Sequence, residues 1–211
     1  MEIICIEDYH MGENTYVVGE GSAAFAVDPG TDADKIVKRA AEHGFKITDI
    51  LLTHGHYDHI CGVQKLRNAT GARLWASAKT DDMICNSVTN LSEMFGDSMA
   101  LDRADVVVED RKEYTVCGIN IQVLLTPGHT DGGTCYLAGD GNDRVLFSGD
   151  TLFCRSVGRT DFPTGDEREL VNSIKNVIYK LDDDITVYPG HGGKTSVGYE
   201  KKFNLLVNDE G

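Results

Sequence analysis

The sequence predicts a mixed α/β protein with one continuous core, and two observations support this. Short apolar runs typical of strands alternate along the chain with segments whose apolar residues recur at helical spacing. The chain has 211 residues, which is enough for one sizeable core and short for two independent domains. We therefore expect a single domain over residues 1–211.

Nine apolar runs are expected to form strands, and turn-forming glycines cluster at their ends. Within 119–125, apolar residues alternate with Asn120 and Gln122, which is typical of a half-buried strand. The nine predicted strands are Ile3–Ile6, Thr15–Val18, Ala24–Val27, Ile47–Thr53, Val106–Val108, Ile119–Leu125, Thr134–Ala138, Val145–Ser148 and Ile185–Tyr188.

Two segments show strong helical periodicity. In Asp32–Gly44 the apolar residues recur at i, i+3, i+4 and i+7, and Gly44 is placed to cap the C-terminus. A second helix is expected over Glu167–Leu181, where Asp166 and Glu169 predict a capping box. Shorter helices are expected after His59, near Thr80–Asn86 and near Tyr199–Leu206.

Charge and hydropathy restrict the partners. Lys plus Arg number 20 and Asp plus Glu number 34, so the formal net charge is −14. Such a surface repels phosphate backbones and anionic lipid, so neither nucleic acid nor a membrane is an expected partner. No apolar run approaches the ~20 residues that span a bilayer, and no secretory signal is readable. The expected compartment is the cytoplasm, and the expected assembly is a monomer or a weak homodimer.

The six cysteines are expected to be mostly buried free thiols. No two of them lie close enough in sequence for a Cys-x-x-Cys motif, and nothing indicates export to an oxidising compartment. Cys61 and Cys154 follow the motifs described next; burial is expected for both, with a redox-sensitive thiol as the alternative.

Three of the seven histidines fall within six residues, in the motif THGHYDH directly after an apolar strand. His54 and His56 are two residues apart, so both can point the same way if the strand stays extended. Asp58 and His59 follow where the chain turns into a helix. Imidazole nitrogens and a carboxylate that converge at a strand end predict a metal site rather than a polar turn.

Three further strands each end in a candidate ligand beside a glycine, which lets the backbone approach closely. These ligands are His129, Asp150 and His191. Seven ligands at the ends of four strands are too many for one zinc ion and suit two metals. The predicted set is His54, His56, Asp58, His59, His129, Asp150 and His191.

The ordered motifs THGHYDH, TPGHT, SGDT and YPGHG resemble those of the metallo-β-lactamase superfamily of hydrolases over essentially the whole chain. The resemblance implies a four-layer αβ/βα sandwich with two divalent metal ions at one edge; zinc is expected, and iron or manganese would also suit the ligands. By the family's pattern, metal one takes His54, His56 and His129, metal two takes Asp58, His59 and His191, and Asp150 bridges both.

Residues 148–162, which include GRTDF, resemble the glyoxalase II branch, and the tail after Gly190 resembles its short bacterial members. Those proteins hydrolyse thioesters such as S-lactoylglutathione. The C-terminal helical segment with which full-length glyoxalase II grips glutathione is not expected here, and the tyrosine of its glutathione loop has no counterpart beside Arg159. The resemblance therefore implies a thioesterase.

Two metals held in this way would lower the pKa of a bridging water to near neutrality, and the resulting hydroxide would attack the thioester carbonyl. Asp58 and Asp150 are expected to orient that hydroxide as well as to bind metal. Arg155, Arg159 and Lys194 are positive charges near the ligand loops. We expect them to attract an anionic thiol conjugate, with solvated surface positions as the alternative.

Two other functions stay open. Persulfide dioxygenases of the same fold also resemble this sequence, and in them a single iron is held by the residues that match His54, His129 and Asp150. The second is a metal-binding scaffold without catalysis. Antibiotic hydrolysis is not expected, because true β-lactamases of the family usually carry a cysteine among the second-metal ligands, where Asp150 stands here.

Overall fold

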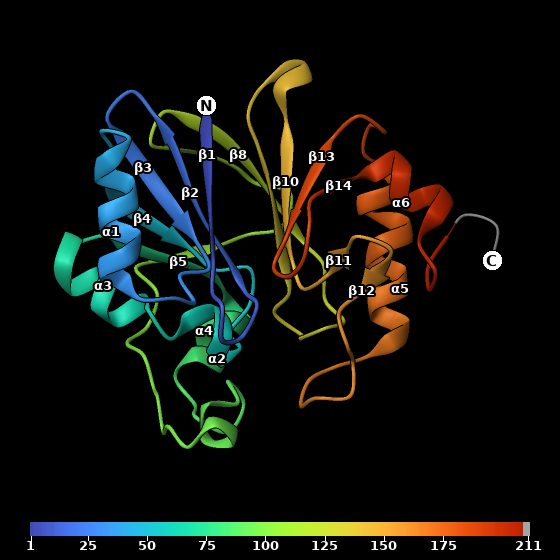
Figure 1. Ribbon diagram of the computed structural model, residues 1–211. Helices are drawn as coiled ribbons and strands as arrows, with labels where there is room; N and C mark the ends of the chain where they lie inside the picture. The colour runs from blue at the N-terminus through green and yellow to red at the C-terminus, as the bar shows by residue number, and fades with distance from the viewer. Residues whose placement is uncertain (209–211) are drawn as a thin grey trace.

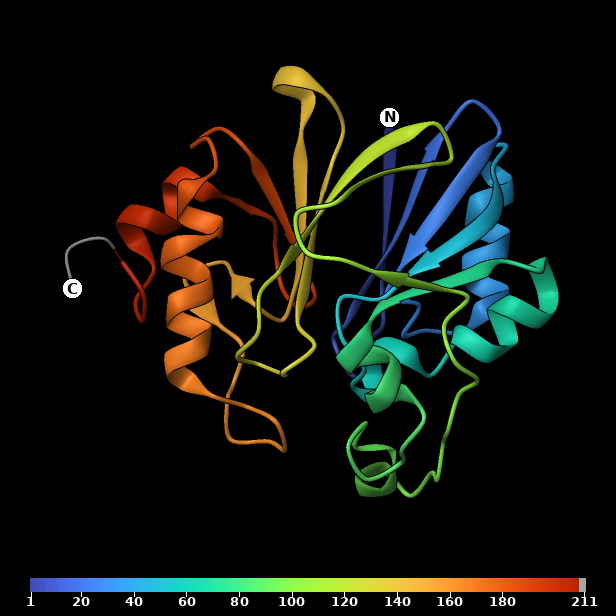
Figure 2. The same cartoon turned by 180° about the vertical axis from the view of Figure 1, so that it is seen from behind.

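The computed structural model of the chain describes residues 1–208, and its elements form four layers: helices, sheet, sheet, helices (Figure 1). The strand order is β1-β2-β3-β4-β5-β6 in the first sheet and β14-β13-β10-β9-β8-β7 in the second. Seen from behind, the sheets face each other, with α1 and α3 outside the first and α5 and α6 outside the second (Figure 2). The predicted mixed α/β sandwich is confirmed. Residues 209–211 of the predicted domain lie outside the described residues.

The two sheets take up most of the chain. The first contains β1 (Glu2–Glu7), β2 (Asn14–Glu20), β3 (Ala23–Val27), β4 (Lys46–Leu51), β5 (Arg73–Ser77) and β6 (Val106–Val108). The second contains β7 (Glu113–Val116), β8 (Ile119–Leu125), β9 (Thr134–Ala138), β10 (Val145–Gly149), β13 (Thr186–Pro189) and β14 (Thr195–Ser196), and β11 (Leu152–Phe153) pairs with β12 (Ser156–Val157). All nine predicted strands are present; β5, β7, β11, β12 and β14 were not predicted.

The helices cover the outer faces and the loop end of the sheets. They are α1 (Ala33–Glu42), α2 (Tyr57–Ile60), α3 (Val63–Thr70), α4 (Ala78–Ile84), α5 (Glu167–Asn176) and α6 (Val197–Phe203), with 3-10 turns at Ser92–Phe95, Gly141–Asp143 and Ile178–Lys180. The Asp166 half of the predicted capping box is confirmed, because its carboxylate accepts from the backbone N–H of Arg168 and of Glu169. The Glu169 half is wrong, because the backbone N–H of Asp166 donates to the carbonyl of Gly128 at 2.8 Å instead. The predicted extension of α5 to Leu181 is wrong: the α-helix ends at Asn176, and a 3-10 turn follows at Ile178–Lys180.

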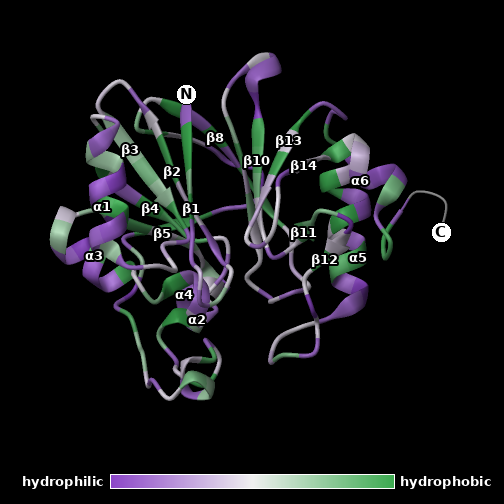
Figure 3. Cartoon of the chain, viewed as in Figure 1, coloured by the Kyte–Doolittle hydropathy of each residue, from purple (hydrophilic) through white to green (hydrophobic). Residues whose placement is uncertain are grey.

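Three clusters of buried apolar side chains hold the elements together. Hydrophobic and hydrophilic residues alternate along helices α1 and α5 (Figure 3). Between the sheets, the Phe147 ring lies 5.4 Å from that of Tyr16 and 6.5 Å from that of Phe25, measured between centroids. Outside the first sheet α1 buries Ile36, and outside the second α5 buries Leu170. Burial on both faces of each sheet explains why its strands read as short continuous apolar runs.

Parallel pairing brings several strand ends to one edge. Strands β3 and β4 are parallel neighbours in the first sheet, and β10 and β13 are parallel neighbours in the second. The loops that follow these strands therefore meet where the two sheets come together. Asn14 fastens the sheets there, because its amide donates to the carbonyls of Pro189 (3.1 Å) and Gly192 (2.9 Å).

The expectation of mostly buried thiols is wrong. Cys135 is buried, Cys61 is partly buried, and Cys154 is exposed because it lies in the turn between β11 and β12. All six cysteines are free. None of the helices between residues 1 and 208 combines the length and apolar character that a bilayer crossing requires.

Candidate metal centre

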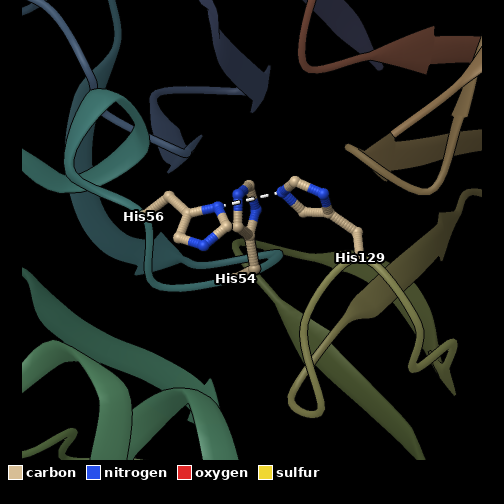
Figure 4. Close-up of side chains that lie close together, drawn as sticks. All are labelled: His54, His56 and His129. Carbon is tan, nitrogen blue, oxygen red and sulfur yellow. Dashed lines mark hydrogen bonds between the residues drawn. The ribbon is translucent and has the colours of Figure 1, made fainter. Parts of the chain in front are cut away.

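Three buried histidines meet where the two sheets come together. His54 and His56 follow β4, and His129 follows β8. The side chains point toward one another, and His56 Nδ1 lies 2.9 Å from His129 Nε2 (Figure 4). One ligand atom from each of the three falls within 4.8 Å of the others, so the group can hold a metal ion.

A second group of three lies beside the first. Asp58 and His59 belong to α2, and His191 follows β13. The Nε2 atom of His191 lies 3.3 Å from Asp58 Oδ2 and 3.3 Å from His59 Nε2. Their ligand atoms also fall within 4.8 Å of one another, so this group is a second candidate for a metal ion.

The Asp150 carboxylate lies between the two groups. Its Oδ1 is 3.3 Å from His59 Nε2, and its Oδ2 is 3.6 Å from both His129 Nε2 and His191 Nε2. Gly190 makes room for it, because a Cβ at that position would lie 2.2 Å from Asp150 Oδ1. The structure thus brings all seven predicted ligand side chains together.

Hydrogen bonds on the outer side orient three of the histidines toward the centre. His129 donates from Nδ1 to the carbonyl of Arg159 (2.7 Å), and His191 donates from Nδ1 to that of Gly12 (3.0 Å). The Thr53 hydroxyl donates its proton to Asp28, so His54 Nδ1 donates to Thr53 Oγ1 at 3.1 Å. In these three rings Nδ1 is engaged on the outer side and Nε2 is left to face inward, an orientation that outer hydrogen bonds commonly give to metal-binding imidazoles.

Unpaired polar atoms also mark the centre. Four buried side-chain N or O atoms in the described part of the chain have no hydrogen-bond partner, and three of them are here: His54 Nε2, His56 Nε2 and Asp150 Oδ1. Leaving such atoms unpaired costs about 1–3 kcal/mol each. Imidazole nitrogens and carboxylate oxygens suit zinc, iron or manganese. The residues present therefore fit a metal.

Burial sets the protonation of the first group. Desolvation, with the neighbouring histidines adding to it, holds the pKa of His54 well below its usual value and lowers the pKa of His56 to about 3. Both rings are therefore neutral at pH 7 and have a lone pair for a metal. A neutral imidazole is the form that binds metal.

The carboxylates dominate the second group. Burial lowers the pKa of His59, but the charges of Asp150 and Asp58 outweigh burial and raise it well above the usual value. Burial raises the pKa of Asp150, but the interaction with His59 outweighs the effect of burial. The pKa of Asp150 therefore lies below its usual range. Binding of a metal by His59 would therefore release a proton.

Asp28 is a buried contributor to the centre that our sequence interpretation missed. Its Oδ2 accepts from His59 Nδ1 at 3.0 Å, and its Oδ1 accepts from the backbone N–H of Thr53 at 2.7 Å. It also forms, with His54 and His59, a third group whose ligand atoms lie within 4.8 Å. The available signal was its position directly after β3, which matches the position of the other candidates after their strands.

Replacing Asp28 with asparagine is expected to weaken metal binding by about 10- to 100-fold, because outer carboxylates orient ligating histidines and raise their basicity. Competition with a chromophoric chelator measures the affinity. Asp34→Asn is the matched control, since the Asp34 side chain is 74% exposed and pairs only with Lys65 in the described ion pairs. Equal affinity in Asp28→Asn and the unmodified chain would remove Asp28 from the centre.

The three predicted substrate-binding residues lie in different places. Arg159 lines a cavity of about 440 Å³ that also contains five of the seven predicted ligands. Arg155 lies in the turn after β11 and does not line the cavity. Its backbone N–H donates to the carboxylate of Glu200. Lys194 lines a separate hollow with Cys154. Only Arg159 is therefore placed to meet a molecule in the cavity.

Two face-to-face sheets with histidines and carboxylates gathered where their strands end are the architecture of the metallo-beta-lactamase fold, with a candidate metal centre at its edge. Residues 9–191 match the family model described as "Metallo-beta-lactamase superfamily". Hydroxyacylglutathione hydrolase GloC of Haemophilus influenzae is 32% identical over 216 residues, which cover 100% of this chain and 99% of that protein. The chain belongs to the metallo-beta-lactamase superfamily.

Solved structures agree with that assignment. The BLEG-1 B3 metallo-beta-lactamase matches with a TM-score of 0.91 and 31% identity, over 98% of this chain and 99% of that chain. The protein TTHA1623, solved in a di-iron-bound form, matches with a TM-score of 0.84 and 29% identity, over 97% of this chain and 100% of that chain. The fold of these proteins is therefore present over nearly the whole chain.

Proposed function

We propose that this protein is a metal-dependent thioesterase that hydrolyses S-acyl thiol conjugates such as S-lactoylglutathione, using two divalent ions, zinc in the first instance. One ion would be held by His54, His56 and His129 and the other by Asp58, His59 and His191, with Asp150 between them. Residues 1–211 would act as one catalytic domain in the cytoplasm, as a monomer or a weak homodimer.

The position of Asp150 carries this proposal. Its two oxygens lie within 3.6 Å of histidines from both groups, so a single carboxylate can serve two ions. The Nε2 atoms of His59 and His191, which a site of His54, His129 and Asp150 alone would not use, both lie within 3.6 Å of an Asp150 oxygen. The GloC relative, a hydroxyacylglutathione hydrolase by name, supports the choice of a thioester.

Divalent ions bound here would polarise the substrate carbonyl and lower the pKa of a coordinated water to near neutrality. The chain's own residues do the rest. Asp58 and Asp150 are acceptors placed to hold the attacking water by its protons. The walls of the 440 Å³ cavity confine the substrate next to them. Because a thiolate leaves without prior protonation, no strong general acid is needed.

The test is steady-state hydrolysis of S-lactoylglutathione by the metal-loaded protein with oxygen excluded. Turnover is expected, and a chelator should abolish it until metal is restored. The metal content, measured on the same sample, should be close to two ions per chain.

Two results would contradict this proposal. The first is absence of thioester turnover with about one iron per chain and oxygen-dependent consumption of a persulfide. The second is opening of a β-lactam ring without thioester hydrolysis.

A further inference from the structure

One side of the cavity is apolar and unusually exposed. Half of its twelve lining residues are apolar, and three of these form what we call the apolar rim: Leu91, Met94 and Phe95. Met94 is 68% exposed and Phe95 is 58% exposed. Large apolar side chains exposed together at the mouth of a cavity are typical of a surface that binds an apolar ligand.

The apolar rim is held firmly in place. Buried Asn90 donates from its amide to the carbonyl of Met99 (2.9 Å) and accepts from the backbone N–H of Ser92 (2.9 Å). The Ser92 hydroxyl in turn accepts from the N–H of Met99 at 3.0 Å. These hydrogen bonds link the two ends of the 90–99 segment, so the segment that carries the apolar rim is internally hydrogen-bonded.

The rim is also fixed to the metal centre. The backbone N–H of Tyr57, the first residue of α2, donates to the carbonyl of Asn90 at 2.8 Å. The Tyr57 ring stacks on Phe95, with centroids 5.2 Å apart. Since α2 carries Asp58 and His59, these contacts join the apolar rim directly to the helix that holds two of the predicted ligands.

The side chains that line the cavity provide little positive charge for an anionic substrate. Arg159 is the one Lys or Arg among the residues that line it. Its Nε and Nη2 atoms pair with the two carboxylate oxygens of Asp161 at 2.6 and 2.7 Å, and its guanidinium lies 4.0 Å from the centroid of the Phe162 ring. Asp161 therefore engages two of the five N–H donors of Arg159 and offsets its charge, and the flat face of the guanidinium lies over the Phe162 ring.

We propose that the apolar rim binds an uncharged aliphatic or aromatic group of the substrate beside the scissile thioester bond, so that such thioesters are better substrates than S-lactoylglutathione. This inference rests on the proposed thioesterase function and adds its substrate class. The apolar group can belong to the acyl chain or to the thiol, and the experiment separates the two.

The experiment compares two neutral series with the metal-loaded protein. In one, acetyl, butanoyl and hexanoyl groups are carried by N-acetylcysteamine; in the other, the acetyl group is carried by ethanethiol, butanethiol and hexanethiol. We expect kcat/KM to rise about two- to fourfold for each added methylene in one series, as expected for a group that leaves water for an apolar surface. The series that rises identifies the side of the substrate that meets the rim.

Phe95→Ser should flatten that dependence on chain length. Val88→Ser is the matched control: Val88 is as exposed as Phe95, lies in the same loop and does not line the cavity. Circular dichroism and thermal melting check that both variants fold. A second readout that needs no turnover is the affinity for S-methylglutathione and S-hexylglutathione, measured by calorimetry. The hexyl thioether should bind the unmodified chain more tightly than the methyl thioether does, and Phe95→Ser should weaken binding of the hexyl thioether.

The outcomes separate the two proposals. Hydrolysis of every thioester at equal kcat/KM would overturn the apolar rim and leave the thioesterase intact. A length dependence that Phe95→Ser does not change would also overturn it. If no thioester is hydrolysed the thioesterase proposal fails, and equal affinity for the two thioethers would then overturn the rim as well.

Discussion

Replacing Asp150 with asparagine is expected to reduce thioester hydrolysis by about 10²–10³-fold, or about 2.7–4 kcal/mol in activation free energy, because the carboxylate proposed to serve both ions is lost. We call His54, His56 and His129 one triad and Asp58, His59 and His191 the other. The Asp150 carboxylate lies beside both triads, with His59 Nε2 at 3.3 Å and His129 Nε2 at 3.6 Å. Asparagine keeps its shape and removes its charge. The measurements are kcat/KM for the thioester and the metal content of the purified variant.

The matched control for this change is Asp182→Asn. The Asp182 side chain is 71% exposed and pairs with Arg144, and it does not line the cavity. This variant should keep both activity and metal content. Full activity in Asp150→Asn would show that the carboxylate does not join the two triads, and the two-metal arrangement would have to be abandoned.

The second large effect is expected for His191→Ala, which should lower the metal content from two ions per chain to one and reduce hydrolysis by at least about 10²-fold. His191 belongs to one triad only, with Nε2 3.3 Å from Asp58 Oδ2. The other triad keeps all three of its histidines. Plasma emission spectroscopy counts the ions, and steady-state kinetics on the same sample gives the rate.

This variant also separates the thioesterase from the mononuclear-iron alternative, whose ligands would be His54, His129 and Asp150. Under that alternative the same change leaves the metal content near one ion and affects the rate mildly. His43→Ala serves as the control, because His43 is exposed at the end of α1 and pairs with Glu2. A robustly active His191→Ala hydrolase would contradict the assignment of the second metal.

The sequence was most informative where chemistry and local structure coincide. His54 and His56 directly follow β4, and Asp58 and His59 open the next helix, so four candidates were already close in the chain. Their convergence with the later loops could be expected because each candidate ends a strand. Whether these residues bind metal stays a prediction.

The unpredicted elements depend on neighbours that are distant in sequence. Strand β5 begins with the charged residue Arg73. The strand is held in the sheet by pairing with β4 on one side and β6 on the other. Arg73 and Trp75 both bind the buried carboxylate of Asp49 in β4, a contact that no local pattern reveals. Strand β7 alternates polar and apolar residues, but it has only four residues, which is too few for the alternation to be recognised in the sequence.

Asp28 was missed for a related reason. A single aspartate after a strand is usually a turn former, and its role depends on the His59 ring, which is 31 positions further along the chain. Cys154 was misjudged because its exposure follows from a two-stranded hairpin whose strands have two residues each. Strands this short leave no readable alternation.

The separation of the two triads along the chain has a consequence for how the protein folds. His56 and His129 are 73 residues apart, and His59 and His191 are 132 residues apart. Closing loops of this length costs conformational entropy, which is offset by the packing of the two sheets. An ion therefore finds either triad complete only after both halves have docked. Binding of a metal ion would therefore follow assembly of the two sheets, and it would add its stabilisation to a chain that already has its topology.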